Sequence, residues 1–228
     1  MKKIITLSVI VLGMFFSWHG FSQSSNTEDI NRAKVKYRKS LQYNDYGMAK
    51  NAIYDLMVLE PSNYSYLDSL AYMYYEFRQY ASAALVSKDA LKYNANNQML
   101  LQIAAQSFNE LGAVEQSMQM YQRLYNVSDD AFILYEVANK QYELKNYQDA
   151  LLNTELLLGK PMVTATLVKV KNSSEDEIEI LFKAVIFNLQ GLIAKGQGND
   201  EDAKKYFNSA LKVAPNYALP KENLNPSN

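Results

Sequence analysis

The chain has no cysteine among its 228 residues, and its only histidine and only tryptophan, His19 and Trp18, lie near the N-terminus. Disulfide bonds are therefore excluded, and the usual zinc sites built from histidine and cysteine are excluded as well. Nucleophilic systems of the Ser-His-Asp or Cys-His kind need a histidine that the chain lacks once its first residues are removed. We expect no cofactor, no metal site and no catalysis.

Glycine and proline are also scarce, with 8 and 5 residues, whereas there are 18 tyrosines. An all-β fold would need more turn residues, and this composition suits helices that pack through large rings. The formal charge of -1 leaves no basic excess for neutralising phosphates, so we expect neither nucleic acid nor an acidic lipid surface as a partner. Apolar residues make up 48% of the chain, enough for a core without disulfides.

The first residues have the pattern of a secretory signal peptide. Lys2 and Lys3 precede the apolar run Ile4–Phe16, and small residues follow at Gly20 and Ser22. The run is about 13 residues long, shorter than the ~20 that a membrane-spanning helix needs. We therefore predict a signal peptide over 1–22, with no stable membrane insertion after its removal.

Cleavage after Ser22 makes Gln23 the new N-terminus, and cleavage after Gln23 or retention of the segment are the alternatives. The mature chain then has no His, Cys or Trp, and 21 basic residues face 24 acidic ones. We expect residues 23–29 to form a short linker. We expect an exported protein, in the periplasm of a Gram-negative envelope or, alternatively, outside the cell.

One spacing of aromatic, alanine and leucine residues recurs in five windows of the remaining chain. The window from Tyr64 contains Leu70, Ala71, Tyr74, Tyr80, Ala83, Ala90, Leu91 and Ala95. The window from Ala184 contains Gly191, Ala203, Phe207, Ala210, Leu211 and Pro215. The other three contain Tyr37, Tyr46, Ala49, Ile53, Leu56 and Pro61, then Leu101, Ala104, Ala105, Phe108, Ser117, Tyr121 and Leu124, then Leu134, Val137, Ala138, Tyr147, Ala150, Leu151 and Leu157.

This spacing resembles the tetratricopeptide-repeat (TPR) consensus of W-x2-L-G-x2-Y, then A-x3-F, then A and P, over about residues 30–217. The resemblance implies an all-α fold, a right-handed α-solenoid of about five helix pairs. Small residues at Ala83, Ala150 and Ala203 would let paired helices cross at about 8–10 Å. Repeats 1–4 are expected over 30–160 and repeat 5 over 184–217.

Capping and turn residues agree with this division. Polar residues that can accept the free N–H groups of a first helical turn precede four of the apolar-periodic runs. Glycine can end a helix in the left-handed conformation. The expected N-caps are Asp45, Ser62, Asp129 and Asp200, and the expected glycine turns are Gly112 and Gly198.

The segment 161–183 interrupts the repeats. Val168 and Val170 alternate with Lys169 and Lys171, and the alternation resumes over Glu177–Ile180, which favours a β-hairpin. The alternative is a helix, since Ser174 with Glu177 forms a capping box and apolar residues keep helical spacing at Ile178, Leu181, Phe182, Val185 and Leu189. Residues 218–228 are expected to form a short C-terminal capping helix and a tail.

In TPR proteins the first helix of each pair lines the concave wall, so the resemblance implies a binding surface there. Inward positions carry tyrosines, amides and acids, which would suit an extended, neutral or basic peptide. Glu76, Glu110 and Glu143 recur at equivalent positions, although a solvated helix face is the commoner explanation of such a pattern. The candidate residues are Tyr72, Tyr75, Glu76, Gln106, Asn109, Glu110, Tyr135, Asn139, Tyr142 and Glu143, with Gln102 and Glu136 beside them.

The predicted function is a non-catalytic interaction scaffold of the cell envelope that binds a peptide or protein segment in the concave groove. A structural subunit that grips its neighbours through convex faces or the hairpin is the alternative, favoured if outer helices expose apolar patches. A carboxylate-based hydrolase is a distant third. Its acidic groups, Asp129 with Asp130 and Asp200 with Glu201 and Asp202, lie at predicted helix starts, where they serve the helix dipole.

Overall fold

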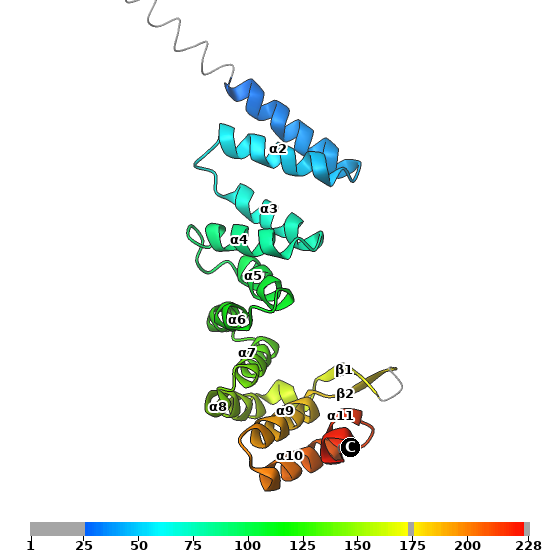
Figure 1. The fold of residues 1–228 in the computed structure, drawn as a ribbon. Helices are drawn as coiled ribbons and strands as arrows, with labels where there is room; N and C mark the ends of the chain where they lie inside the picture. The colour runs from blue at the N-terminus through cyan, green and yellow to red at the C-terminus, as the bar shows by residue number, and fades with distance from the viewer. Residues whose placement is uncertain (1–25, 173–175, 226–228) are drawn as a thin grey trace, which may run out of the picture. The chain divides into compact units, whose positions relative to one another are not determined.

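The structure, a computed structural model, describes residues 26–172 and 176–225 (Figure 1). The predicted signal peptide, 1–22, and the last residues, 226–228, lie outside this part. The chain divides into two compact units, Met1–Ala95 and Asn96–Asn228, and each is described by itself. Along the described residues, no helix is both long enough and apolar enough to cross a membrane.

Helices follow one another as pairs joined by short turns. In the first unit they are a helix over 26–42, α2 (Tyr46–Leu59), α3 (Ser65–Glu76) and α4 (Tyr80–Ala90). The second unit has α5 (Gln98–Glu110), α6 (Val114–Ser128), α7 (Ala131–Glu143), α8 (Tyr147–Leu158), α9 (Phe182–Gly196), α10 (Asp200–Val213) and α11 (Ala218–Leu224). Between α8 and α9 lie a 3-10 helix, η1 (Pro161–Thr164), and two strands, β1 (Leu167–Lys171) and β2 (Glu177–Leu181).

The turn within each pair contains one residue in the left-handed conformation. These residues are Asn44 (φ 56°), Arg78 (φ 55°), Gly112 (φ 69°), Lys145 (φ 60°) and Gly198 (φ 79°). The following residue donates its N–H to a carbonyl near the end of the first helix, as when the Gln79 nitrogen lies 2.8 Å from the Tyr74 oxygen. This bond is typical of a helix C-terminus closed by a left-handed residue. The two predicted glycine turns are confirmed, and three further turns of the same kind have no glycine.

The expected N-caps are only partly confirmed. Asp45 accepts a hydrogen bond from the Met48 N–H at 3.0 Å, as predicted. The other three expectations were wrong. Asn199 rather than Asp200 caps α10, and Asp130 rather than Asp129 caps α7. Asp129 instead ends α6 in the left-handed conformation and pairs with Lys160, 2.7 Å away.

Ser62 does not cap α3, which begins at Ser65 after Tyr64, a residue without a side-chain capping bond. Asn63 makes the local bonds instead, accepting from the Ser65 hydroxyl at 2.7 Å. A serine, an asparagine and a proline cluster before this helix, so residue type alone does not select the capping position.

The first unit has its core between α2 and α3. Ala49, Ile53, Leu70 and Met73 form a buried cluster, and Tyr74 packs at its border. Polar contacts join the helices around this core. Lys34 Nζ lies 3.0 Å from the Glu60 carboxylate, which also accepts a hydrogen bond from the Tyr66 hydroxyl.

Small residues let the helices of the second unit approach closely. Ala138 on α7 and Ala150 on α8 are fully buried in one cluster. Ala203 on α10 is buried with Phe207, and Gly191 on α9 lies under the Phe207 ring. Ala150 and Ala203 are positions where the sequence pattern predicted close helix crossings.

The predicted β-hairpin is confirmed, and the alternative helix over this segment is not formed. β1 pairs antiparallel with β2, with Lys169 opposite Glu179 and Val170 opposite Ile178. Ile180 is buried, and Val168, Val170 and Ile178 are partly buried against the same cluster. The outward face carries exposed Lys169, Lys171, Glu177 and Glu179. The alternation therefore places one face on the core and one in solvent.

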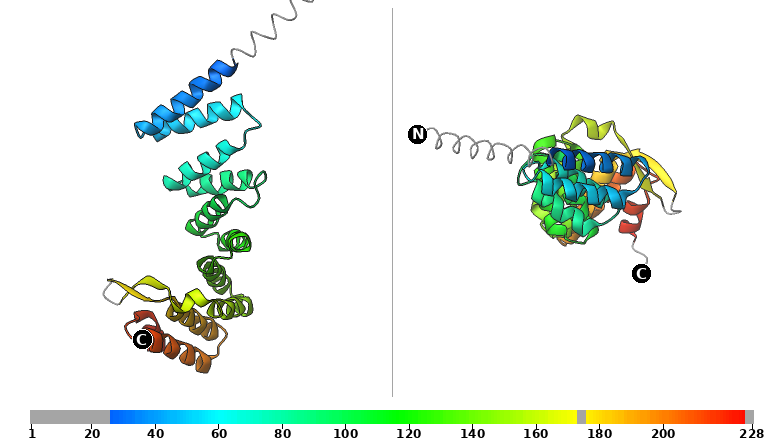
Figure 2. Two further views of the ribbon diagram at one scale, coloured as in Figure 1. Left: turned by 180° about the vertical axis from the view of Figure 1, so that it is seen from behind. Right: turned by 90° about the horizontal axis from the view of Figure 1, so that it is seen from above.

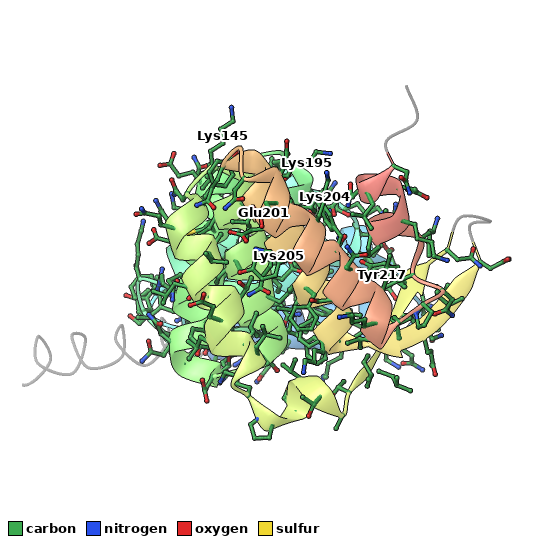
Figure 3. The ribbon with its side chains drawn as sticks, turned by 90° about the horizontal axis from the view of Figure 1, so that it is seen from below. Lys145, Lys195, Glu201, Lys204, Lys205 and Tyr217 are labelled. Atoms are coloured by element: carbon green, nitrogen blue, oxygen red, sulfur yellow. The ribbon has the colours of Figure 1, made fainter. Side chains whose placement is uncertain are left out.

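The hairpin and α11 lie at the end of the second unit, beside α9 (Figures 1 and 2). Tyr217, which precedes α11, is buried with Ile180 and Phe182 in the cluster below the hairpin (Figure 3). Burial raises the pKa of the Tyr217 phenol to about 12. On α11, the Asn223 side chain donates a hydrogen bond to Asn188 of α9 at 3.2 Å. These contacts cover the last helix pair, as the end of a helical stack requires.

Candidate protein-binding surface

The helix α5 is buried on most of its surface. Leu100, Leu101, Ile103, Ala104, Ala105 and Ser107 are all buried. Five of the residues that keep solvent exposure form one stripe, mostly with three- and four-residue steps, the spacing of a single helix face, while Gln98 and Phe108 keep exposure outside it. That stripe consists of Met99, Gln102, Gln106, Asn109 and Glu110.

The helix α7 repeats this stripe at the same offsets. Its members are Phe132, Tyr135, Asn139, Tyr142 and Glu143, with Glu136 beside them. Because α6 packs against both α5 and α7, the two helices occupy equivalent places in successive pairs. We call the two stripes together, including Glu136, the α5–α7 face.

The first half of the corresponding stripe on α9 is buried. Val185 and Asn188 hold its first two inner positions with exposed fractions of 8% and 5%. Val185 belongs to the cluster below the hairpin, and Asn188 is bonded to α11. Only the later part of the stripe keeps exposure, with Leu192 partly buried and Lys195 exposed (Figure 3). The α5–α7 face therefore ends where the hairpin and α11 begin.

The charges of the α5–α7 face are mostly negative. Lys140 is buried, and its Nζ lies 2.7 Å from Glu143, which also accepts from the Asn139 amide at 3.3 Å. Glu136 and Glu110 have no ion pair within the described residues. Burial raises the pKa of the Glu136 carboxyl, and nearby Lys140 lowers it to a smaller extent. The face thus carries three carboxylates, and its one buried cation, Lys140, lies near Glu143 and Glu136.

Two of the candidate tyrosines are partly core residues. Tyr135 packs edge-on against Phe182 with ring centroids 5.4 Å apart, and burial raises the pKa of its phenol. Tyr142 lies 6.2 Å from the Tyr147 ring, and burial raises its pKa too. Both rings therefore help fix α7, and a ligand would meet only their remaining exposed edges.

Three candidates lie on α3, in the first unit. Tyr72 is 49% exposed and Glu76 is exposed as well. Tyr75 is partly buried, with its ring centroid 6.0 Å from that of Tyr80. These side chains follow the same helical offsets as their counterparts on α5 and α7.

Two apolar members of the α5–α7 face were not among the predicted residues. Met99 and Phe132 begin the two stripes and are 41% and 40% exposed. Phe132 stands beside the buried Phe182 ring, with centroids 4.8 Å apart. Met99 and Phe132 hold equivalent places in successive first helices, and this recurrence could have identified them. The predicted set contained only polar residues and tyrosines.

The acid pairs considered for hydrolysis have local roles. Asp130 accepts from the Phe132 and Ile133 N–H groups at 2.7 and 3.3 Å at the start of α7. Asp202 lies in the first turn of α10, where Lys205 and Asn199 bond to it and hold its pKa below the usual range. Among the residues that the structure describes, no group of three or more His, Cys, Asp or Glu could hold a metal ion.

The comparisons with known proteins identify the fold. No family model matches the chain, and no curated protein matches it. Among solved structures, YrrB, "a TPR protein with an unusual peptide-binding site", has a TM-score of 0.65 and 14% identity, over 89% of this chain and 95% of that one. The MamA protein has a TM-score of 0.60 and 15% identity, over 89% and 98%.

A third similar structure is a tetratricopeptide repeat protein from Parabacteroides merdae ATCC 43184. Its TM-score is 0.60 and its identity 18%, over 86% of this chain and 71% of that one. At this level of identity the likeness concerns the fold alone. The chain has the fold of tetratricopeptide-repeat proteins, as the sequence pattern predicted.

Proposed function

We propose that this chain is a protein-interaction scaffold and that the α5–α7 face holds an extended segment of another protein. The observation that carries the proposal is the pair of matching stripes, each the main solvent-facing side of an otherwise buried first helix. The two stripes share an apolar residue at their first position, an amide at their third and a glutamate at their last.

The chemistry of the face supports peptide binding. Gln102, Gln106 and Asn139 carry amide groups that donate and accept hydrogen bonds, as a peptide backbone does. The exposed edge of Tyr142 offers apolar contact with a polar tip. The peptide-binding site named for YrrB, which shares the fold, agrees with this role.

The test is site-specific photocrosslinking with a displayed library of random peptides. A photoreactive residue replaces Gln106 on the α5–α7 face in one variant and Gln119, exposed on α6, in a matched control. We expect library-selected peptides to crosslink through position 106 and not through position 119. Selection of no binding peptide, or crosslinking through position 119 alone, would overturn the proposal.

The alternative of a structural subunit has one specific observation in its favour. Leu152 and Leu156 lie one turn apart on α8 with exposed fractions of 64% and 51%. Neighbouring apolar side chains on an outer helix are a feature of protein interfaces. Replacing both with serine should leave peptide crosslinking at position 106 unchanged if the α5–α7 face is the working surface. If the double replacement abolishes that crosslinking, α8 is the working surface.

We also propose that the scaffold works in the cell envelope after export. The support is the pattern of Lys2 and Lys3, the apolar run Ile4–Phe16 and the small residues Gly20 and Ser22. N-terminal sequencing of the protein from fractionated source cells should find Gln23 first, in the periplasmic fraction. A cytoplasmic protein that begins at Met1 would contradict this location.

A further inference from the structure

The two ends of the α5–α7 face differ in chemistry. Met99 and Phe132 mark the end at the helix N-termini, where both side chains are two-fifths exposed. Glu110 and Glu143 mark the other end, at the helix C-termini. About 16 Å of helix axis separates the ends, at 1.5 Å of rise per residue. One edge of the face is therefore apolar and the opposite edge is acidic.

The middle of the face carries amides. Gln106 and Asn139 hold equivalent places on α5 and α7, both partly exposed. From them the acidic edge is about 6 Å away along the axis and the apolar edge about 10 Å. A peptide that crosses both helices along this line would have backbone partners beneath it and a different chemistry on each side.

The acidic edge keeps negative charge at Glu110, although Lys140 of α7 pairs with Glu143. Lys140, with its side chain 7% exposed, is engaged by Glu143. Glu110 keeps its charge without an ion pair inside the described residues, and Glu136, on the same face but outside the acidic edge, has no ion pair there either. A cation brought by a partner would therefore meet uncompensated carboxylates, and a partner's carboxylate would be repelled.

An extended chain directs successive side chains to opposite sides. Resting on this geometry and on the proposed function of the face, we propose that the bound segment alternates apolar with basic residues. Its apolar side chains point toward the Met99 and Phe132 edge, and its lysines or arginines point toward the Glu110 and Glu143 edge. The flexible stems of lysine and arginine span the distance from the amide line to the glutamates.

The test measures fluorescence anisotropy of three labelled peptides with the whole mature chain. One alternates leucine and lysine over eight residues, the second has glutamate in place of lysine, and the third has the same leucines and lysines in two blocks. The alternating leucine–lysine peptide should bind at least about fivefold more tightly than either of the others, and its affinity should fall as salt rises.

Two variants assign the edges. Glu110→Gln should weaken binding of the leucine–lysine peptide about two- to fivefold, the range of one exposed ion pair. Glu115→Gln, on the exposed surface of α6, is the matched control and should change nothing. Met99→Gln should weaken the same peptide, whereas Leu152→Gln on α8 should not. Circular dichroism of each variant shows whether it is folded.

The outcomes separate the two proposals. If library-selected peptides crosslink at position 106 but the leucine–glutamate or block peptide binds equally well, the alternating pattern is overturned and the scaffold function stands. If no peptide binds and none crosslinks, the scaffold function is overturned, and the alternating pattern that rests on it is overturned with it. If the unlabelled chain itself displaces the peptide and sediments as an oligomer, the face belongs to a second copy and the inference is overturned.

Discussion

Gly191 of α9 lies directly under the ring of Phe207 of α10. A Cβ added at residue 191 would come within 2.4 Å of Phe207 Cε1, closer than real side chains approach. Phe207 is 1% exposed and packs with Ala194 and Ala203. The absence of a side chain at one position therefore sets how closely the last helix pair crosses, and the buried ring fills the space that the glycine leaves.

Gly191→Ala is expected to destabilise the protein although alanine favours helices. The methyl group must displace a buried ring, and overpacking of this kind costs about 1–3 kcal/mol. That cost exceeds the helix preference for alanine over glycine, about 1 kcal/mol at most. Denaturant unfolding followed by circular dichroism measures the difference. An unchanged or raised unfolding midpoint would show that Phe207 moves away freely.

At one of the left-handed turns, a substitution is expected to stabilise the protein. Lys145 has φ 60°, a conformation that costs a residue with a Cβ about 1–2 kcal/mol. Lys145→Gly should therefore raise the free energy of unfolding by about 1 kcal/mol. The reverse change, Gly112→Ala, should lower it by a similar amount, because a Cβ at residue 112 meets nothing within 4 Å and only the backbone conformation is at stake. Equal stability of both variants and the parent would contradict a conformational cost at these turns.

The five left-handed turns also show what the sequence could predict and what it could not. Gly112 and Gly198 were identified because glycine is the usual residue for this conformation. Asn44, Arg78 and Lys145 adopt it in the equivalent turns because the packed helix pairs on either side determine the backbone path. Tertiary packing overrides local preference at these three positions. The helix pairs themselves were predictable, since the spacing of small and aromatic residues encodes the crossings.

The hairpin should depend on its inward face. Ile180 is 3% exposed in the cluster that contains Phe182 and Tyr217. Ile180→Ala removes buried methyl groups and is expected to cost about 2–4 kcal/mol. Lys169→Ala, on the outward face, should cost less than about 0.5 kcal/mol. Thermal unfolding of the two variants compares them, and equal losses would mean that the hairpin does not pack through the face described above.

Glu136 should make stability depend on pH. Burial raises the pKa of its carboxyl in the folded state above the unfolded value. The neutral acid is therefore favoured by folding, and the stability it contributes is present below the unfolded pKa and lost as pH rises through the folded pKa. Glu136→Gln should accordingly raise the melting temperature near pH 7 and have no such effect near pH 4.

The matched control for this prediction is Glu115→Gln, because Glu115 is exposed on α6. The same Glu136→Gln variant should bind the leucine–lysine peptide more weakly at pH 7, since it removes a carboxylate from the α5–α7 face. If the Glu136→Gln variant is less stable than the parent at pH 7, the attraction between Lys140 and the Glu136 carboxylate outweighs the cost of burying that carboxylate.

The binding surface was less predictable than the fold. Gln106, Asn139 and Glu143 were found from their helical offsets, which place them on one exposed face. The burial of Tyr135 depends on Phe182 and the hairpin, which come from a distant part of the chain. Met99 and Phe132 were passed over because an apolar residue on an amphipathic helix is usually assigned to the core. The choice of Tyr135 and the omission of Met99 and Phe132 have one cause. Offsets along a single helix do not show which of its residues another segment of the chain buries.

The most direct test of the scaffold function is NMR on the mature chain with a library-selected peptide. The side-chain amide signals of Gln102, Gln106, Asn109 and Asn139 report on the α5–α7 face, and Gln119 on α6 provides an internal control. We predict that the peptide shifts the signals of the four amides on the face while that of Gln119 stays in place. Shifts confined to Gln119 and the outer helices, with the amides of the α5–α7 face unmoved, would contradict the proposed role of this surface.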